Sequence, residues 1–153
     1  MTTLCRLLGP VFLVALLPSS ASAARLADGT PIRVRILGVI TSETSIAGDP
    51  LEFVVVRDIV RDGEVVVPRG ARVSGAVVVA RRMSVGWSTQ PGRLAFQFHA
   101  TASRGGRAIR LRASPDSMPA ASVIVDRDRR HHWLQWAGGG DTFDAFVDGD
   151  YDL

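Results

Sequence analysis

Alternation of apolar and polar residues is the dominant pattern of this chain after residue 30. Residues 31–40 (PIRVRILGVI) begin by alternating isoleucine or valine with arginine, and residues 93–101 (RLAFQFHAT) alternate apolar with mostly polar side chains. A period of two places successive side chains on opposite faces of an extended chain, so each segment predicts a strand with one buried face. Further strands are expected at residues 51–60, 65–67, 72–80, 108–113, 122–125 and 142–147.

Turn-forming residues separate these segments. Asp62-Gly63 lies between two runs of β-branched residues, which predicts a hairpin that joins residues 51–60 to residues 65–67. Gly75 interrupts a valine-rich strand and is a candidate β-bulge. Residues 84–92 (SVGWSTQPG) are expected to form the one long irregular loop of the first half.

The pattern also indicates the fold class. No segment shows the period of a convincing amphipathic helix, and short strands at regular spacing are typical of antiparallel sandwiches and small barrels. We therefore expect an all-β protein, with a single small antiparallel β-barrel or sandwich of about seven or eight strands. The spacing alone leaves the choice between barrel and sandwich open.

The first 23 residues have a different character. Arg6 precedes an apolar run of eleven residues (LLGPVFLVALL), and Ala21-Ser22-Ala23 supplies the small-x-small pattern of a cleavage site. The run is shorter than the roughly 20 residues that a membrane-spanning helix needs. Residues 1–23 are therefore expected to be a signal peptide. The mature protein is expected in the periplasm or outside the cell, with peripheral attachment to the outer membrane as a further option.

Cleavage at this position would remove the single cysteine, Cys5, and leave 130 of the 153 residues. That length suits one domain, stabilised by its core without disulfide bonds. No apolar stretch of membrane-spanning length follows the signal peptide. We expect a β-domain at residues 24–147, followed by an acidic C-terminal tail at residues 148–153.

Charge is distributed unevenly along the expected mature chain. Residues 24–112 contain fourteen Arg against seven acidic residues, whereas residues 113–153 contain three Arg against eight. The two parts could neutralise each other within one domain, or a partner could recognise the acidic end. A pI of about 10.3 suits nucleic-acid binding. The export signal and the scattered arginines argue against that function, and no nucleic-acid partner is expected.

No catalytic or metal-binding constellation stands out. Ser88 lies in a sequence (GWSTQ) that lacks the final glycine of a nucleophile elbow. His99, His131 and His132 do not have the spacing of a zinc site. Residues 148–152 (DGDYD) begin like a calcium loop but lack its later ligands. We expect no enzyme activity, no metal and no cofactor, with a small metal-dependent envelope hydrolase that uses the histidines as an alternative.

Binding residues are better supported than catalytic ones. The arginines on the polar faces of residues 31–36 and 108–112 could contact anionic polymers or lipid head groups. Trp87, Trp133 and Trp136 could form a platform for sugar stacking, although tryptophans more usually lie in a core or anchor a loop. The candidate binding residues are Arg33, Arg35, Trp87, Arg110 and Arg112.

Residues 28–112 also contain a set of motifs in a recognisable order. They begin with Asp28-Gly29-Thr30-Pro31-Ile32, continue with Gly48-Asp49, and end with residues 65–75 (VVVPRGARVSG). This order resembles the pattern of the TrbI-like family of type IV secretion scaffolds, and of many small exported bacterial β-domains. In the scaffolds the pattern belongs to a β-barrel domain that builds an outer-membrane-associated core complex through subunit contacts.

The resemblance implies a fold type and a non-enzymatic, envelope-associated character. This sequence shows no proline-rich spanning region, inner-membrane helix or helical antenna of those scaffolds, so membership of a secretion machine does not follow. We expect an exported envelope domain that acts by binding another protein, with oligomeric state open. The alternatives are a module for glycan or anionic polymer and the small hydrolase described above.

Overall fold

The computed structural model describes residues 24–116, 122–125 and 135–153, and within these ranges the chain forms strands and no helix. No described segment is therefore a helix that could cross a membrane. The strands are β1 (Arg25–Leu26), β2 (Pro31–Ile36), β3 (Ile40–Thr41), β4 (Pro50–Val55), β5 (Ile59–Arg61), β6 (Glu64–Val67), β7 (Arg72–Arg81), β8 (Arg93–Ala102), β9 (Ala108–Arg112), β10 (Val123–Ile124), β11 (Trp136–Ala137), β12 (Thr142–Val147) and β13 (Tyr151–Asp152).

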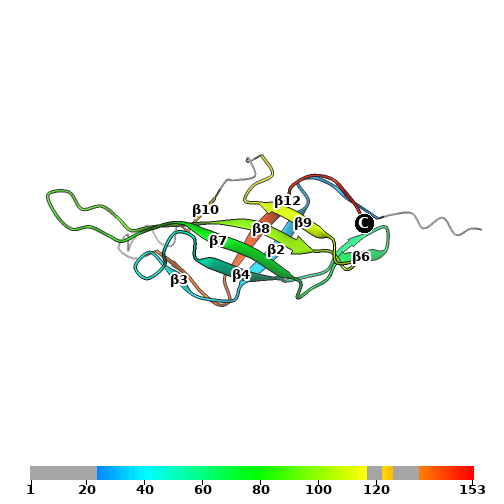
Figure 1. The fold of residues 1–153 in the computed structure, drawn as a ribbon, viewed down its shortest axis with the longest axis horizontal. Coiled ribbons are helices and arrows are strands. Elements are labelled where there is room, and N and C mark those ends of the chain that lie inside the picture. The colour runs from blue at the N-terminus through cyan, green and yellow to red at the C-terminus, as the bar shows by residue number, and fades with distance from the viewer. Residues whose placement is uncertain (1–23, 117–121, 126–134) are drawn as a thin grey trace, which may run out of the picture.

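Six of these strands close into an antiparallel barrel in the order β8-β7-β4-β2-β12-β9, with β9 returning to β8 (Figure 1). The strand β10 pairs with Phe96 and Ala95 of β8, on the edge of β8 that β9 also pairs with farther along. β10 is therefore a seventh strand of this sheet and lies outside the closed ring. The all-β prediction is confirmed, and the closing β8–β9 pairing decides in favour of the barrel.

The barrel interior is filled by side chains that alternate inward along each strand. In β2 every second residue is buried, as the sequence pattern predicts. Phe53 lies at the centre of an aromatic cluster, with its ring centroid 5.3 Å from that of Phe96 and 5.1 Å from that of Phe98. Phe143 on β12 closes the cluster, 4.9 Å from Phe96 and nearly perpendicular to it. This aromatic packing joins three different strands, β4, β8 and β12, around one core.

The predicted bulge at Gly75 is confirmed, because the pairing of β7 with β8 shifts between Ser74 and Gly75. A second shift lies between Val77 and Val79. Bulges increase the bending and twist of a strand, which a small barrel needs in order to close.

Two expected strands are divided. Residues 51–60 form β4 and, after an interruption at residues 56–58, the separate strand β5, while residues 31–40 end their strand at Ile36. The predicted Asp62-Gly63 hairpin is confirmed, with positive φ at both residues, but it joins β5 to β6. β4 pairs instead with β2 and β7. The apolar run over residues 51–60 does not reveal where β4 ends and β5 begins, because both strands contain buried apolar side chains.

The two ends of the described chain are fastened together. β1 pairs with β13. The Asp28 carboxylate accepts a hydrogen bond from Gly149 N at 2.7 Å, and the Asp150 carboxylate accepts one from Asp28 N at 2.9 Å. The hydroxyl of Tyr151 accepts a further bond from Arg110 N at 2.9 Å. Residues 148–153, expected to form an acidic tail, thus contact the barrel through backbone and side-chain bonds.

Candidate binding arm

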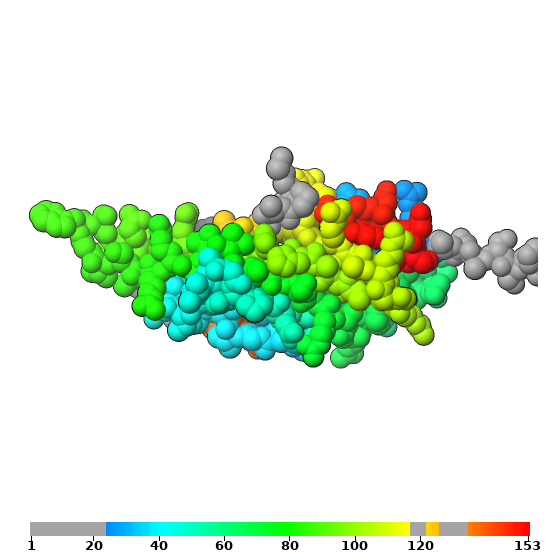
Figure 2. Space-filling model, in the orientation of Figure 1, coloured from blue at the N-terminus to red at the C-terminus, as the bar shows by residue number. Residues whose placement is uncertain are grey.

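β7 and β8 continue beyond the barrel as a two-stranded arm, defined here as residues 78–94. The ladder between β4 and β7 ends at Ala76. Val77 marks its limit, because Val77 N donates to the Asp49 carbonyl and the Val77 carbonyl accepts from Gly48 N. Figure 1 shows the arm at one end of the long axis of the molecule, and Figure 2 shows how the surface tapers along it. At the arm's root Arg82 Nε donates to the carbonyl of Glu43 at 2.8 Å.

The tip of the arm is a closed loop that carries apolar side chains into solvent. Ser84 and Gln90 exchange two backbone hydrogen bonds of 3.1 and 2.9 Å, which close residues 85–89 into a loop. Trp87 in this loop is fully exposed, and Val85 is 74% exposed. Of the predicted binding residues, Trp87 lies in the arm, whereas the other four lie on the barrel strands β2 and β9.

The outer face at the base of the arm carries an apolar row, defined as Val79, Ala95 and Ile124. These residues are direct partners in the pairings of β7, β8 and β10. Val79 is 40% exposed and Ile124 is 73% exposed. A hollow of about 190 Å³ lies over this row, and Arg93 and Ser122 contribute to its lining.

The next row toward the tip is cationic. Arg81 and Arg93 are direct cross-strand partners and both are exposed. Residues 65–115 contain no Asp or Glu, so the arm has no carboxylate of its own. Like charges that face each other across two strands are destabilising. In the described part of the chain no ion pair joins either arginine to a carboxylate.

The four predicted arginines outside the arm lie on one outer surface, formed by the adjacent strands β2, β12 and β9. Arg33 forms a two-point ion pair with Asp144, at 2.9 and 3.0 Å. This hydrogen bond lowers the pKa of the Asp144 carboxyl and raises the pKa of Arg33. Arg35 is exposed and lies opposite Thr142.

Arg110 and Arg112 contact the end of the chain. The Arg112 side chain is only 12% exposed and lies 2.8 Å from Asp28 and 3.5 Å from Asp148. Arg110 lies 3.8 Å from the same Asp148. These pairs favour the interpretation that the basic and acidic parts of the chain neutralise each other. Three of the four arginines therefore already have carboxylate partners within the protein.

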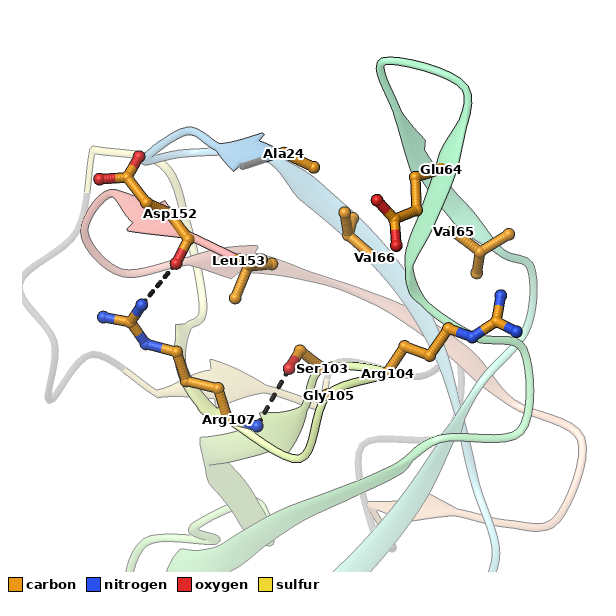
Figure 3. Close-up of a pocket in the computed structure, with 10 residues that line it drawn as sticks. All are labelled: Ala24, Glu64, Val65, Val66, Ser103, Arg104, Gly105, Arg107, Asp152 and Leu153. Atoms are coloured by element: carbon orange, nitrogen blue, oxygen red, sulfur yellow. Dashed lines mark hydrogen bonds between the residues drawn. The ribbon is translucent and has the colours of Figure 1, made fainter. Parts of the chain in front are cut away.

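Another hollow, of about 400 Å³, is drawn in Figure 3. It lies near β6 and the C-terminus, at the opposite end of the molecule from the arm (Figure 1). The turn between β8 and β9, the strand β6 and residues 152–153 enclose it. Arg107 bridges two of these elements, since its guanidinium donates to the Asp152 carbonyl and its backbone N–H donates to Ser103 Oγ at 3.0 Å. The arginine here therefore fastens the chain end to the β8–β9 turn.

The histidines and the remaining tryptophans have separate positions. His99 is exposed on β8, with its Nε2 atom 3.0 Å from Gln97 Nε2. His131, His132 and Trp133 lie outside the described residues. Trp136 is 43% exposed and belongs to the β3–β11 pair. Among the residues that the structure describes, no group of three His, Cys, Asp or Glu side chains could hold a metal ion.

The sequence reasoning missed the paired arginines and the apolar row of the arm. One signal was available, because the absence of acids over residues 65–115 can be counted directly. The register that places Arg81 opposite Arg93, and Ile124 beside Ala95, could not be read from the sequence. It depends on the bulges in β7 and on a contact with a strand about thirty residues away.

Comparison with known proteins gives limited information. No family model matches the sequence, and no curated protein matches it. Among solved structures, the chain is similar to ComB10 of the Com type IV secretion system of Helicobacter pylori, with 20% identity and a TM-score of 0.39. The match covers 58% of this chain and 43% of that chain, so this chain spans less than half of the ComB10 structure. The similarity to a secretion-system protein is thus distant.

Proposed function

We propose that this protein is a non-enzymatic binding domain of the bacterial envelope, exported by its signal peptide, and that its arm contacts a protein partner. The observation that carries the proposal is Trp87, which is fully exposed at the tip of a closed hairpin loop. An exposed tryptophan on a projecting element is costly to solubility and contributes nothing to the barrel core. Such residues are typical anchors of protein interfaces, together with arginine.

The energetics support an anchoring role for this side chain. Burying a large apolar side chain contributes on the order of 2–3 kcal/mol. The loop is already closed by the Ser84–Gln90 bonds, so less conformational entropy is lost when a partner binds. A partner that covers Trp87 and Val85 would gain apolar burial without reorganising the barrel.

Site-specific photo-cross-linking in living cells tests the proposal. The photoreactive residue p-benzoylphenylalanine would replace Trp87 or Val85 and, as a matched control, Arg104 in the exposed β8–β9 turn at the far end of the molecule. We expect a discrete protein adduct from the arm positions and none from the control. Adducts from position 104 alone, or from no position, would contradict the proposed role of the arm.

A glycan or an anionic polymer is the second candidate, because the arm combines Trp87 with Arg81 and Arg93, which face each other and have no ion pair among the described residues. Sedimentation with purified peptidoglycan tests the second candidate, because a domain that binds only a protein would not be retained. Retention through arginine would decline steeply with added salt, since screening weakens exposed charges, whereas a glycan contact centred on Trp87 would persist and be lost in Trp87→Ala.

A further inference from the structure

We propose that Arg81 and Arg93 form a clamp for a carboxylate of the partner, and that the adjacent apolar row of Val79, Ala95 and Ile124 receives an apolar side chain of the same segment. This inference rests on the proposed function and names the chemistry of the partner. The ligand class is an extended protein segment with an acidic side chain two residues from an apolar one.

The spacing follows from the pairing of the strands. Along β7 the apolar row and the arginine row are two residues apart, at Val79 and Arg81, and along β8 they are two residues apart, at Ala95 and Arg93. Positions two apart in a strand face the same side, so both rows lie on one outer face. The hollow beside Ile124 is lined by Val79 as well as Arg93, which places both chemistries at one site.

The arginine pair is electrostatically incomplete within the described chain. Elsewhere on the barrel surface, Arg33 pairs with Asp144 and Arg72 lies 2.6 Å from Glu52. Arg81 and Arg93 instead face each other, and residues 65–115 supply no acid. A bound anion between them would convert a mutual repulsion into two attractive contacts.

A carboxylate suits this site better than a neutral group. The guanidinium group is planar and donates two parallel hydrogen bonds to a carboxylate, and two facing arginines can hold the two oxygens of one group. Ser122 adds a hydroxyl at the edge of the hollow. The hollow of about 190 Å³ is small and bordered mainly by aliphatic side chains, which favours an aliphatic neighbour to the acid.

A synthetic peptide pair provides the probe. The first peptide repeats Thr-Leu-Thr-Glu and carries a fluorescent label, and the second has Gln in place of every Glu. We expect fluorescence anisotropy to give about tenfold tighter binding of the Glu peptide, the size of effect expected from one charge-assisted contact. Equal binding of the two peptides, or binding of neither, would overturn the clamp.

A double variant separates binding from folding. Arg81→Gln with Arg93→Gln removes the facing charges, and Arg69→Gln with Arg104→Gln removes two exposed charges elsewhere as the control. We expect the first variant to bind the Glu peptide about tenfold more weakly while its Tm rises by about 1–3 °C, because repulsion is relieved. If the two arginines had only a structural role, the variant would lose both affinity for the Glu peptide and thermal stability. A lowered Tm together with weaker binding would therefore contradict the proposal.

Two further results distinguish this inference from the proposed function. If cross-linking at position 87 persists unchanged in the Arg81→Gln, Arg93→Gln variant, the arm binds a partner without the clamp and this inference fails alone. If the photoreactive residue at position 87 yields no adduct while Arg81 and Arg93 are unchanged, the proposed function fails. A third result concerns lipid. If the protein binds vesicles of phosphatidylglycerol and phosphatidylethanolamine but does not discriminate between the Glu and Gln peptides, the arginines bind lipid phosphate, and the proposal of an acidic protein segment is wrong.

Discussion

Gly75 lies where the backbones of β7 and β8 approach each other closely. A Cβ atom at this position would lie 2.5 Å from the carbonyl oxygen of Gln97 and 3.1 Å from the ring of Phe53. The first neighbour is backbone held in the barrel, so it cannot move aside as a flexible side chain would. The residue therefore needs the absence of a side chain, and not a left-handed conformation.

We predict that Gly75→Ala lowers the free energy of unfolding by about 1–3 kcal/mol, because the new methyl group overpacks the bulge. Equilibrium urea denaturation followed by circular dichroism measures the change. Gly86→Ala is the control, since nothing lies within 4 Å of a Cβ atom at that position. Equal stability of Gly75→Ala and the control would show that the two strands separate easily at the bulge.

Three carboxyl groups respond to their partners by a lowered pKa. For Asp28 the main cause is the backbone hydrogen bond from Gly149, followed by Arg112. For Asp150 it is the backbone bond from Asp28, followed by Arg25. For Asp144 it is the side-chain bond from Arg33. A carboxyl whose pKa is lowered by folding stabilises the protein above its unfolded pKa, and this contribution is lost as the pH falls through the folded pKa.

The Tm is therefore expected to decline as the pH drops from about 5 to below 3, as these carboxylates become protonated. In Asp28→Asn the decline should be shallower and the Tm at neutral pH lower, since the charge that favours the folded state is gone. Calorimetric scans across this pH range measure both effects. The exposed turn variant Asp62→Asn serves as control, and an identical pH profile for Asp28→Asn and wild type would contradict the assignment.

At the scale of elements, the loop at the tip of the arm and the barrel have separate roles. All residues from 84 to 91 are exposed, while the aromatic cluster and the paired ends stabilise the barrel. The β5–β6 hairpin also lies outside the barrel ring, but its side chains Ile59 and Val67 are buried in the core. The loop of the arm thus contributes no buried side chain over residues 84–91.

Replacing residues 82–92 by Asn-Gly is expected to change the Tm by no more than about 2 °C, since Asn-Gly favours the tight turn that would join Arg81 to Arg93. The same variant should lose the partner captured through the arm. Thermal denaturation measures the Tm. Co-purification of the variant with the partner that cross-linking of the full-length arm identifies measures the loss of binding. A large loss of Tm would mean that the arm packs against the barrel and is needed for folding.

For the whole molecule, closure of the barrel joins all the main strands into one cooperative unit. Phe53 from β4 contacts the rings of Phe96 and Phe98 from β8, and Phe143 from β12 lies 6.3 Å away. Opening any one ladder would expose this shared cluster. A small domain with a single core is expected to unfold in one transition.

Phe53→Ala should lower the free energy of unfolding by about 3–5 kcal/mol, because it removes the central ring of the cluster. Phe146→Ala is the matched control, since Phe146 lies on the outer side of β12 opposite Arg112 and is only partly buried. Urea denaturation monitored by near-UV and far-UV circular dichroism should show coincident transitions. Separate transitions for the two signals would contradict the single cooperative unit.

Local chemistry determined much of this architecture from the sequence alone. The alternation in residues 31–36 predicts which side chains of β2 are buried, and Asp62-Gly63 predicts a tight turn because both residues accept positive φ. Gly75 indicates the bulge, because only glycine allows backbones to meet so closely. Each of these features depends on a few consecutive residues.

Only the tertiary structure decided the features that depend on distant parts of the chain. The break between β4 and β5, the closing of β9 on β8, and the pairing of β1 with β13 follow from which edges are free when the sheet curls into a barrel. The candidate site has the same origin. Arg81 faces Arg93, and Ile124 lies beside Ala95, because bulges and cross-strand contacts set the register, and a sequence pattern with a period of two specifies faces but not partners.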